Sequence, residues 1–209
     1  AYNSNAQVLG LFGPSGAGKS TLLNMIAGLA IPDSGRLLLD DICLFDSSRK
    51  INIPLHQRRI GMVFQDSRLF PHLRVIDNLK YGFNRLKVKD RRLSLQHIID
   101  LLEIGRLAER PTNEMSSGEA RRILIGRALV HDPQALVLDE PTTSLDLRAT
   151  HELREILRKL TRKGISLLMI THHLPDIIPE IGRVVLMRDG RIHRDGAKEE
   201  VLTAKPLAE

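Results

Sequence analysis

The chain has 209 residues, of which 42% are hydrophobic and 3% aromatic, with no tryptophan and a formal charge of +6. This length suits one large domain, or a domain with a subdomain, and the scarcity of aromatic rings argues against base stacking as a main activity. A positive charge suits a polyanionic ligand, a nucleic acid or an anionic membrane surface. Because the basic residues are dispersed, we interpret them as a solvated surface, including the doublets Arg58-Arg59, Arg91-Arg92 and Arg121-Arg122.

Cysteine content and hydropathy narrow the cellular setting. Cys43 is the only cysteine, so an intrachain disulfide is excluded, which fits a reducing compartment. The sequence shows neither an apolar run of the ~18 residues that cross a bilayer nor a basic-then-apolar export signal. A role at a membrane would therefore require another chain that spans it.

The first half of the chain predicts a strand, a glycine-rich turn and a helix in that order. Residues 7–12 are β-prone and residues 20–29 have a helical apolar pattern, so together they form a βα unit. Residues 32–35 indicate a turn. The segments 36–41 and 61–64 are predicted to be strands.

The second half predicts helices followed by buried strands. Residues 90–103 and 119–130 have helical patterns, and Leu95, Ile98, Ile99 and Leu102 recur at helical spacing. Uninterrupted apolar runs predict strands at 135–138 and 165–170, buried on both faces of a parallel sheet. An amphipathic helix around 153–160 separates them. Asp189-Gly190, between 184–187 and 191–193, predicts a hairpin.

These elements predict an α/β fold with a mainly parallel sheet, a helical insertion subdomain and a reduced antiparallel β-subdomain. We expect a single domain over residues 1–209. Its core is expected to comprise residues 1–74 and 126–209, and the helical subdomain residues from about 75 to 125.

Residues 13–20 carry the most specific motif. The sequence Gly-Pro-Ser-Gly-Ala-Gly-Lys-Ser matches G-x-x-x-x-G-K-[ST], with a predicted strand before it and a helix after it. Glycines allow backbone N–H groups to approach phosphate oxygens, and the helix directs its positive end at the same anion. Lys19 supplies a full charge to the β- and γ-phosphates, and Ser20 a hydroxyl ligand for Mg²⁺. The motif predicts a P-loop that binds a nucleoside triphosphate.

Two acids end the predicted strand 135–138. The carboxyl edge of a parallel sheet is where α/β proteins bind ligands, so Asp139 is suited to hold Mg²⁺ directly or through water. Glu140 is suited to orient and deprotonate an attacking water. A glutamate directly after this aspartate favours ATP hydrolysis with a carboxylate base.

Four further motifs, in order, resemble those of the ABC ATPases over residues from about 7 to 203. Gln65 resembles the Q-loop glutamine, and His172 resembles the switch histidine that contacts the γ-phosphate. Residues 115–119, Met-Ser-Ser-Gly-Glu, resemble the LSGGQ signature, and residues 144–146 the D-loop. The resemblance implies catalytic roles for Glu140, His172, Gln65 and Lys19, and metal binding by Ser20, Gln65 and Asp139. It implies that ATP is bound by Gly13, Pro14, Ser15, Gly16, Ala17, Gly18, Lys19, Ser20, Thr21, Gln65, Ser116, Ser117, Gly118, Glu119, Asp146 and His172.

The resemblance also implies partners. Two copies of the chain would dock head to tail and sandwich each Mg·ATP between the P-loop of one copy and the signature helix of the other. A transmembrane permease subunit would contact the segment 65–73. The chain would then lie in the cytoplasm, peripheral on the cytoplasmic face of the plasma or inner membrane. No nucleic-acid partner is expected.

Residues 61–73 look most like importer ATPases, including the molybdate type, whereas 116–201 look like another branch of the importer-like group. A truncated N-terminus and a mosaic or chimeric chain are both open. The sequence departs from the family at Ser117, which replaces a glycine, and at Glu119, which replaces a glutamine and places an acid near phosphate. Tyr2 lies closer to the P-loop than the aromatic residue that stacks on adenine in the family.

Two alternative functions remain at this point. One is a soluble ABC ATPase that acts on nucleic acid, although such chains carry coiled-coil insertions, zinc elements or tandem ATPase units. The other is an ATP-binding module with weak hydrolysis, because of Ser117, Glu119 or the short N-terminus.

Overall fold

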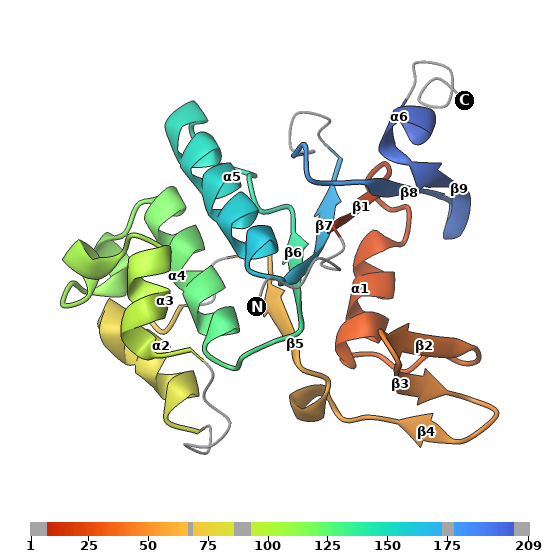
Figure 1. Ribbon diagram of the computed structural model, residues 1–209, viewed down its shortest axis with the longest axis horizontal. Coiled ribbons are helices and arrows are strands. Elements are labelled where there is room, and N and C mark those ends of the chain that lie inside the picture. Colours follow the sequence, from red (N-terminus) through yellow and green to blue (C-terminus); the bar gives the residue numbers. More distant parts are fainter. Residues whose placement is uncertain (1–7, 67–68, 86–92, 173–177, 203–209) are drawn as a thin grey trace.

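The computed structural model describes residues 8–66, 69–85, 93–172 and 178–202. These residues form a six-stranded sheet and a separate three-stranded antiparallel sheet, with helices on either side of the larger one (Figure 1). The arrangement confirms the predicted α/β class with a mainly parallel sheet and a small antiparallel one. Within the described ranges, no helix has the length and hydropathy that crossing a bilayer requires.

The larger sheet has the strand order β5-β6-β7-β1-β8-β9. The first five strands in this order run parallel, and only β9 is antiparallel to its neighbour. The strands are β1 (Val8–Phe12), β5 (Ile60–Val63), β6 (Ala135–Asp139), β7 (Ser166–Thr171), β8 (Arg183–Arg188) and β9 (Arg191–Ala197).

Helices cover both faces of this sheet, which explains the uninterrupted apolar runs in its central strands. Alternate residues of β6 enter different cores: Leu136 and Leu138 join the cluster under α5 (Leu147–Arg162), whereas Val137 joins the one under α1 (Lys19–Ala27). All three are at most 1% exposed. Burial on both faces fixes the register of β6 and therefore the position of the acids at its end.

The helical insertion lies between β5 and β6 in sequence and at one end of the molecule in space (Figure 1). It contains α2 (Val75–Phe83), α3 (Leu95–Leu101) and α4 (Ser117–Leu129), with short 3₁₀ turns at Gly105–Leu107 and Thr112–Glu114. Most residues of α4 are buried, because it packs against α2, α3, α5 and β5 at once. Helix α4 is thus the link between the insertion and the sheet.

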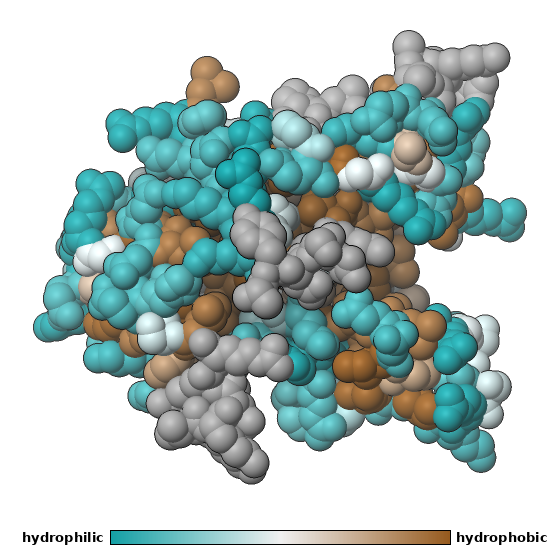
Figure 2. All heavy atoms as spheres, viewed as in Figure 1, coloured by the Kyte–Doolittle hydropathy of each residue, from teal (hydrophilic) through white to brown (hydrophobic). Residues whose placement is uncertain are grey.

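The smaller sheet has the order β2-β3-β4 and follows α1. Its strands are β2 (Arg36–Leu39), β3 (Ile42–Asp46) and β4 (Ile51–Asn52), and the 3₁₀ turn Leu55–Gln57 leads on to β5. Hydrophobic atoms reach the surface around this sheet (Figure 2), where Leu38 and Ile42 are exposed. The short helix α6 (Lys198–Val201) follows β9.

Several predicted boundaries need correction. The strand predicted over 36–41 ends at Leu39, because Asp40 adopts a left-handed φ of 50° and the chain turns back into β3. The helix predicted over 90–103 begins only after Ser94, whose hydroxyl accepts a hydrogen bond from His97 N. Residues 90–92, and the short helix predicted near residue 175, lie outside the described residues. The hairpin at Asp189-Gly190 is confirmed.

The interpretation of the arginine doublets as a solvated surface is wrong for three of their members. Arg58, Arg121 and Arg122 are at most 8% exposed. Arg58 donates to the carbonyls of Met25 and Ile26 at the end of α1, and also to Asn52 Oδ1 in β4 and Ile53 O just after it, at 2.7–2.9 Å. Burial lowers the pKa of Arg58. The guanidinium therefore caps the P-loop helix and joins it to the small sheet.

We expect Arg58→Leu to reduce the free energy of unfolding by about 3 kcal/mol, because it leaves several buried acceptors without a donor. Urea denaturation measures this loss. The adjacent Arg59 is the control, since it pairs mainly with Asp132 at 2.8 Å and is partly exposed. Arg59→Leu should lose about 1 kcal/mol or less. Equal losses in the two variants would contradict the capping role of Arg58.

Candidate functional site

The register of the parallel sheet gathers the predicted functional loops at one edge. Phe12 pairs with Thr171, Asp139 with Ile170, and Val63 with Leu138. The P-loop, Glu140 and His172 directly follow these strand ends, Asp139 is the last residue of β6, and Gln65 lies two residues beyond β5. Segments far apart in the sequence therefore meet where α/β sheets place their ligands.

The P-loop forms a concave turn at the start of α1. Gly13, Gly16 and Gly18 have φ values of 156°, 81° and 90°, and Gly18 is the N-cap of the helix. Such glycine conformations turn successive N–H groups to one side and create an anion-binding nest. A Cβ on Gly16 would have no atom within 4 Å, so the left-handed backbone, and not crowding, favours glycine there. The exposed members of the loop and first helical turn are Pro14, Ser15, Gly16, Ser20 and Thr21, whereas Ala17 is buried.

The Lys19 side chain folds back onto the backbone of the P-loop. Its Nζ donates to the carbonyl oxygens of Gly13 and Pro14, both at 2.8 Å, and the residue is 7% exposed. Burial lowers the pKa of Lys19, and the carboxylates of Glu140 and Asp139 oppose that shift. The ammonium group is thus held between the loop and the acids at the end of β6.

The β8–β9 hairpin supports the P-loop from behind. Gly190 N donates to Ala17 O at 3.2 Å. A Cβ on Gly13 would lie 2.3 Å from the carbonyl oxygen of Met187, so only glycine fits at this contact. The sequence pattern predicted the hairpin but gave no indication that its turn packs against the phosphate loop.

Asp139 and Glu140 form a concentrated negative site beside Lys19. Burial raises the pKa of Asp139, and the nearby Glu140 carboxylate raises it further, while Lys19 and Arg121 lower it. A carboxylate whose charge is disfavoured in this way gains from a neighbouring cation. Ser20 and Asp139 carry hard oxygen atoms of the kind that Mg²⁺ prefers, so these two residues could hold the ion.

Glu140 is held at both carboxylate oxygens. His172 Nδ1 donates to Oε1 at 2.8 Å, and Thr143 Oγ1 donates to Oε2 at 3.2 Å. The backbone of Glu140 has a left-handed φ of 45°, and its N–H donates to Ile170 O at 2.9 Å. A strained conformation fixed by three contacts indicates a carboxylate placed for a task. Thr143 is a positioning residue that the sequence motifs did not reveal.

Gln65 lies two residues beyond β5 with an exposed side chain. Its carbonyl oxygen accepts a hydrogen bond from Arg121 of α4 at 2.9 Å. Gln65 therefore lies at the same edge of the sheet as the P-loop, and its backbone is linked to the helix that begins with the signature.

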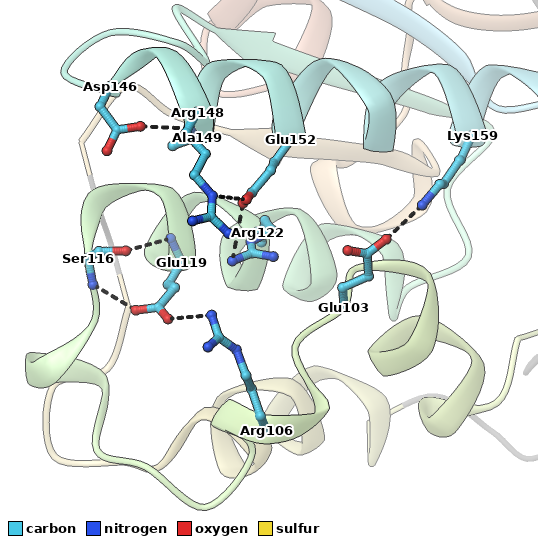
Figure 3. A network of polar contacts seen from close by, with 10 residues as sticks. All are labelled: Glu103, Arg106, Ser116, Glu119, Arg122, Asp146, Arg148, Ala149, Glu152 and Lys159. Carbon is cyan, nitrogen blue, oxygen red and sulfur yellow. Dashed lines mark hydrogen bonds and ion pairs between the residues drawn. The ribbon is translucent and has the colours of Figure 1, made fainter.

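The signature residues form the start of α4. Ser116 is the N-cap: its Oγ accepts from Glu119 N at 3.2 Å, and Glu119 Oε2 accepts from Ser116 N at 3.1 Å (Figure 3). Ser117 is exposed. A Cβ on Gly118 would lie 2.7 Å from that of Ala149, so this glycine lets α4 and α5 approach closely.

The acid at position 119 is turned back on its own helix. Besides the capping box, its Oε1 accepts from Arg106 at 3.4 Å (Figure 3). The start of α4 therefore already has a carboxylate at its positive end. Asp146 has a similar local role at α5, where Oδ1 accepts from Ala149 N at 2.7 Å.

The expected permease-contact segment is described except for residues 67 and 68. Phe70 is partly buried between Tyr81 and Arg127, whereas Pro71 and His72 are exposed. The buried Asn78 side chain binds Phe70 N and O at 2.9 and 3.1 Å. Thr112 Oγ1 donates to Phe70 O and Leu73 O. The side chains of Asn78 and Thr112 thus hold the backbone of this segment, while Pro71 and His72 remain exposed.

Together these features define a P-loop nucleotide-binding protein of the α/β class. Residues 3–143 match the ABC transporter family. Because this match covers most of the chain, and the fold and motifs agree with it, the chain belongs to the ABC transporter family.

The chain is similar to ATP-binding proteins of molybdenum import. It is 40% identical to one from Rhodospirillum rubrum over 99% of this chain and 56% of that protein. It is 42% identical to one from Vibrio parahaemolyticus over 93% of this chain and 52% of that protein. The chain thus spans about half the length of these relatives.

Solved structures give the same fold. CbiO1 from Clostridium perfringens, part of an ABC transporter complex, superimposes with a TM-score of 0.81 at 30% identity, over 96% of this chain and 81% of that chain. A dimeric ATP-binding cassette in a post-hydrolysis state with ADP and Pi gives a TM-score of 0.74 at 28% identity, over 94% and 87% of the two chains.

Proposed function

We propose that this chain hydrolyses Mg·ATP to drive a membrane transporter that imports a solute. The observation that carries the proposal is the geometry at the sheet edge. There, the P-loop and Lys19 lie beside a carboxylate, Glu140, whose two oxygens are held by His172 and Thr143. This combination supplies a triphosphate site and an oriented base in one place.

Each residue has a distinct role in this proposal. The P-loop amides and Lys19 bind the β- and γ-phosphates, and Glu140 orients the attacking water and accepts its proton. His172 keeps Glu140 in place and lies beside the expected position of the γ-phosphate. Ser20, Asp139 and Gln65 would hold Mg²⁺, which when bound neutralises phosphate charge.

A second copy of the chain completes the site. The starts of α4 and α5, with Ser116, Ser117, Gly118, Glu119 and Asp146, would face the ATP on the partner's P-loop. The dimeric cassettes among the structural neighbours support this arrangement. ATP would then hold the two copies together, and its hydrolysis would release them, giving a two-state element to which a transporter can couple.

A permease subunit is the third component. The anchored segment with exposed Pro71 and His72 suits a docking surface for it, and the chain would then be peripheral on the cytoplasmic face of the membrane. We propose molybdenum as the solute, because the relatives at about 40% identity are named as molybdenum import proteins. We further propose that residues of about 75–125 act as a subdomain within one ATPase domain.

The assembly is tested by a pull-down of the chain from native membranes with and without ATP. Recovery of a multi-span permease is the expected result. The identity of that permease, and of any other protein recovered with it, would indicate the solute. Recovery of nucleic acid in place of a permease would reject the transporter assignment and favour the soluble alternative.

We expect Glu119→Gln to strengthen ATP-dependent pairing of two copies by about fivefold, or ~1 kcal/mol, because it removes a negative charge from a helix N-terminus that faces phosphate. Glutamine can still accept the bond from Ser116 N. Analytical ultracentrifugation with ATP, in a Glu140→Gln background that prevents hydrolysis, measures the effect.

Glu114 provides the control for this measurement. It is an exposed glutamate in the turn before α4, paired with Arg110 at 3.5 Å. Glu114→Gln should leave pairing unchanged. Unchanged or weaker pairing in Glu119→Gln would show that the acid does not oppose phosphate.

A further inference from the structure

A buried arginine links the signature helix to the backbone of Gln65. Arg121 lies on α4, two residues after Glu119, and is 6% exposed. Its Nη1 donates to Phe64 O at 2.6 Å and its Nη2 to Gln65 O at 2.9 Å. One guanidinium thus binds two successive carbonyls just beyond the end of β5.

These two carbonyls belong to the first two residues after β5. The last residue of β5 that pairs with β6 is Val63, so Phe64 and Gln65 follow the last paired position of this strand. The Gln65 side chain is exposed, and its direction therefore depends on its backbone. A planar guanidinium that donates to both carbonyls fixes both peptide planes, whereas the ammonium of lysine lacks this rigid fork.

The Arg121 guanidinium also interacts electrostatically with Asp139, the acid at the end of β6. Burial lowers the pKa of Arg121, and the carboxylates of Asp139 and Asp66 oppose that shift. Arg121 in turn favours the ionised form of Asp139. The guanidinium therefore lies within electrostatic reach of the acid expected to hold the cation.

We propose that Arg121 is a positioning residue that couples the signature helix to Gln65, so that a shift of α4 moves the glutamine backbone with it. The inference rests on the proposed ATPase function and adds to it a path between the second copy's nucleotide and this copy's site. Arg121 itself touches neither nucleotide nor water in this scheme.

A double-mutant cycle tests the coupling. Arg121→Met should lower kcat about 30-fold and leave the KM for ATP within about threefold, because a small misplacement of a catalytic side chain is costly whereas the P-loop is untouched. Arg121→Lys should recover only part of kcat. In a Gln65→Ala background, Arg121→Met should have no further effect on kcat. Additive effects of the two substitutions would overturn the proposal.

Arg58→Lys is the matched control, because Arg58 is also a buried donor to backbone carbonyls but contacts neither Phe64 nor Gln65. Its effect should add to that of Gln65→Ala. Hydrogen exchange of residues 60–66 provides a readout that needs no turnover, and Arg121→Met and Arg121→Lys should both speed exchange there. Unchanged exchange would overturn the proposal, whereas an inactive parent with faster exchange in the variants would reject only the ATPase function.

Discussion

Replacing Glu140 with glutamine is expected to lower kcat for Mg·ATP hydrolysis by about 1,000-fold, within the range for loss of a general base. Glutamine has the same shape and keeps an oxygen for His172 or Thr143, so the site should stay assembled. The Kd for ATP should change by less than about threefold, because the P-loop is not altered. Steady-state phosphate release and fluorescent-nucleotide binding measure the two quantities.

The control for this variant is Glu109→Gln. Glu109 forms an exposed ion pair with Arg74 at 2.7 Å, and its removal should leave kcat unchanged. Full turnover in Glu140→Gln would exclude Glu140 as the base. If the variant loses both ATP binding and turnover, the carboxylate would instead maintain the P-loop through its electrostatic interaction with Lys19.

The second large effect is expected at Lys19. We expect Lys19→Ala to weaken Mg·ATP binding about 100-fold, or ~2.7 kcal/mol. The substitution removes a charge from the phosphates, and it also removes the donor that holds the Gly13 and Pro14 carbonyls. Isothermal titration calorimetry with Mg·ATP measures the change in Kd.

Lys198 offers a matched control. Its Nζ also donates to a backbone carbonyl, that of Pro179, at 3.1 Å. Lys198 directly follows Ala197, the last residue of β9, which pairs with Arg183 at the start of β8. Because β8 runs parallel to β1, Lys198 lies at the edge of the sheet opposite to the P-loop. Lys198→Ala should bind ATP normally. Equal affinity in Lys19→Ala and the parent would reject residues 13–20 as the phosphate site.

The sequence pattern predicted the elements whose residues repeat a simple period. The buried strands β6 and β7 appeared as apolar runs because helices cover both their faces, and Asp189-Gly190 revealed the hairpin because few residues tolerate left-handed backbone. The edge at which Lys19, Asp139 and Glu140 meet also followed from the sequence, since parallel strands end on the same side. The expected boundaries of the helical subdomain stay a prediction, and α4 continues past residue 125.

What could not be predicted depends on contacts between distant segments. Arg58 and Arg121 are basic residues in doublets, and a doublet is usually solvated. They are buried because each finds carbonyl acceptors at the end of another element, which no local pattern records. Likewise, the hydroxyl of Thr143 and the turn at Gly190 act on Glu140 and the P-loop only once the sheet has formed.

The guanidinium of Arg58 also affects the way in which the protein unfolds. Its bonds to Met25, Ile26 and Asn52 span the end of α1 and the last strand of the small sheet. If either element unfolds alone, Arg58 loses part of its hydrogen bonds and buried polar groups are left without partners. The P-loop helix and β2–β4 should therefore form one cooperative foldon, and damage to the small sheet would be felt at the triphosphate.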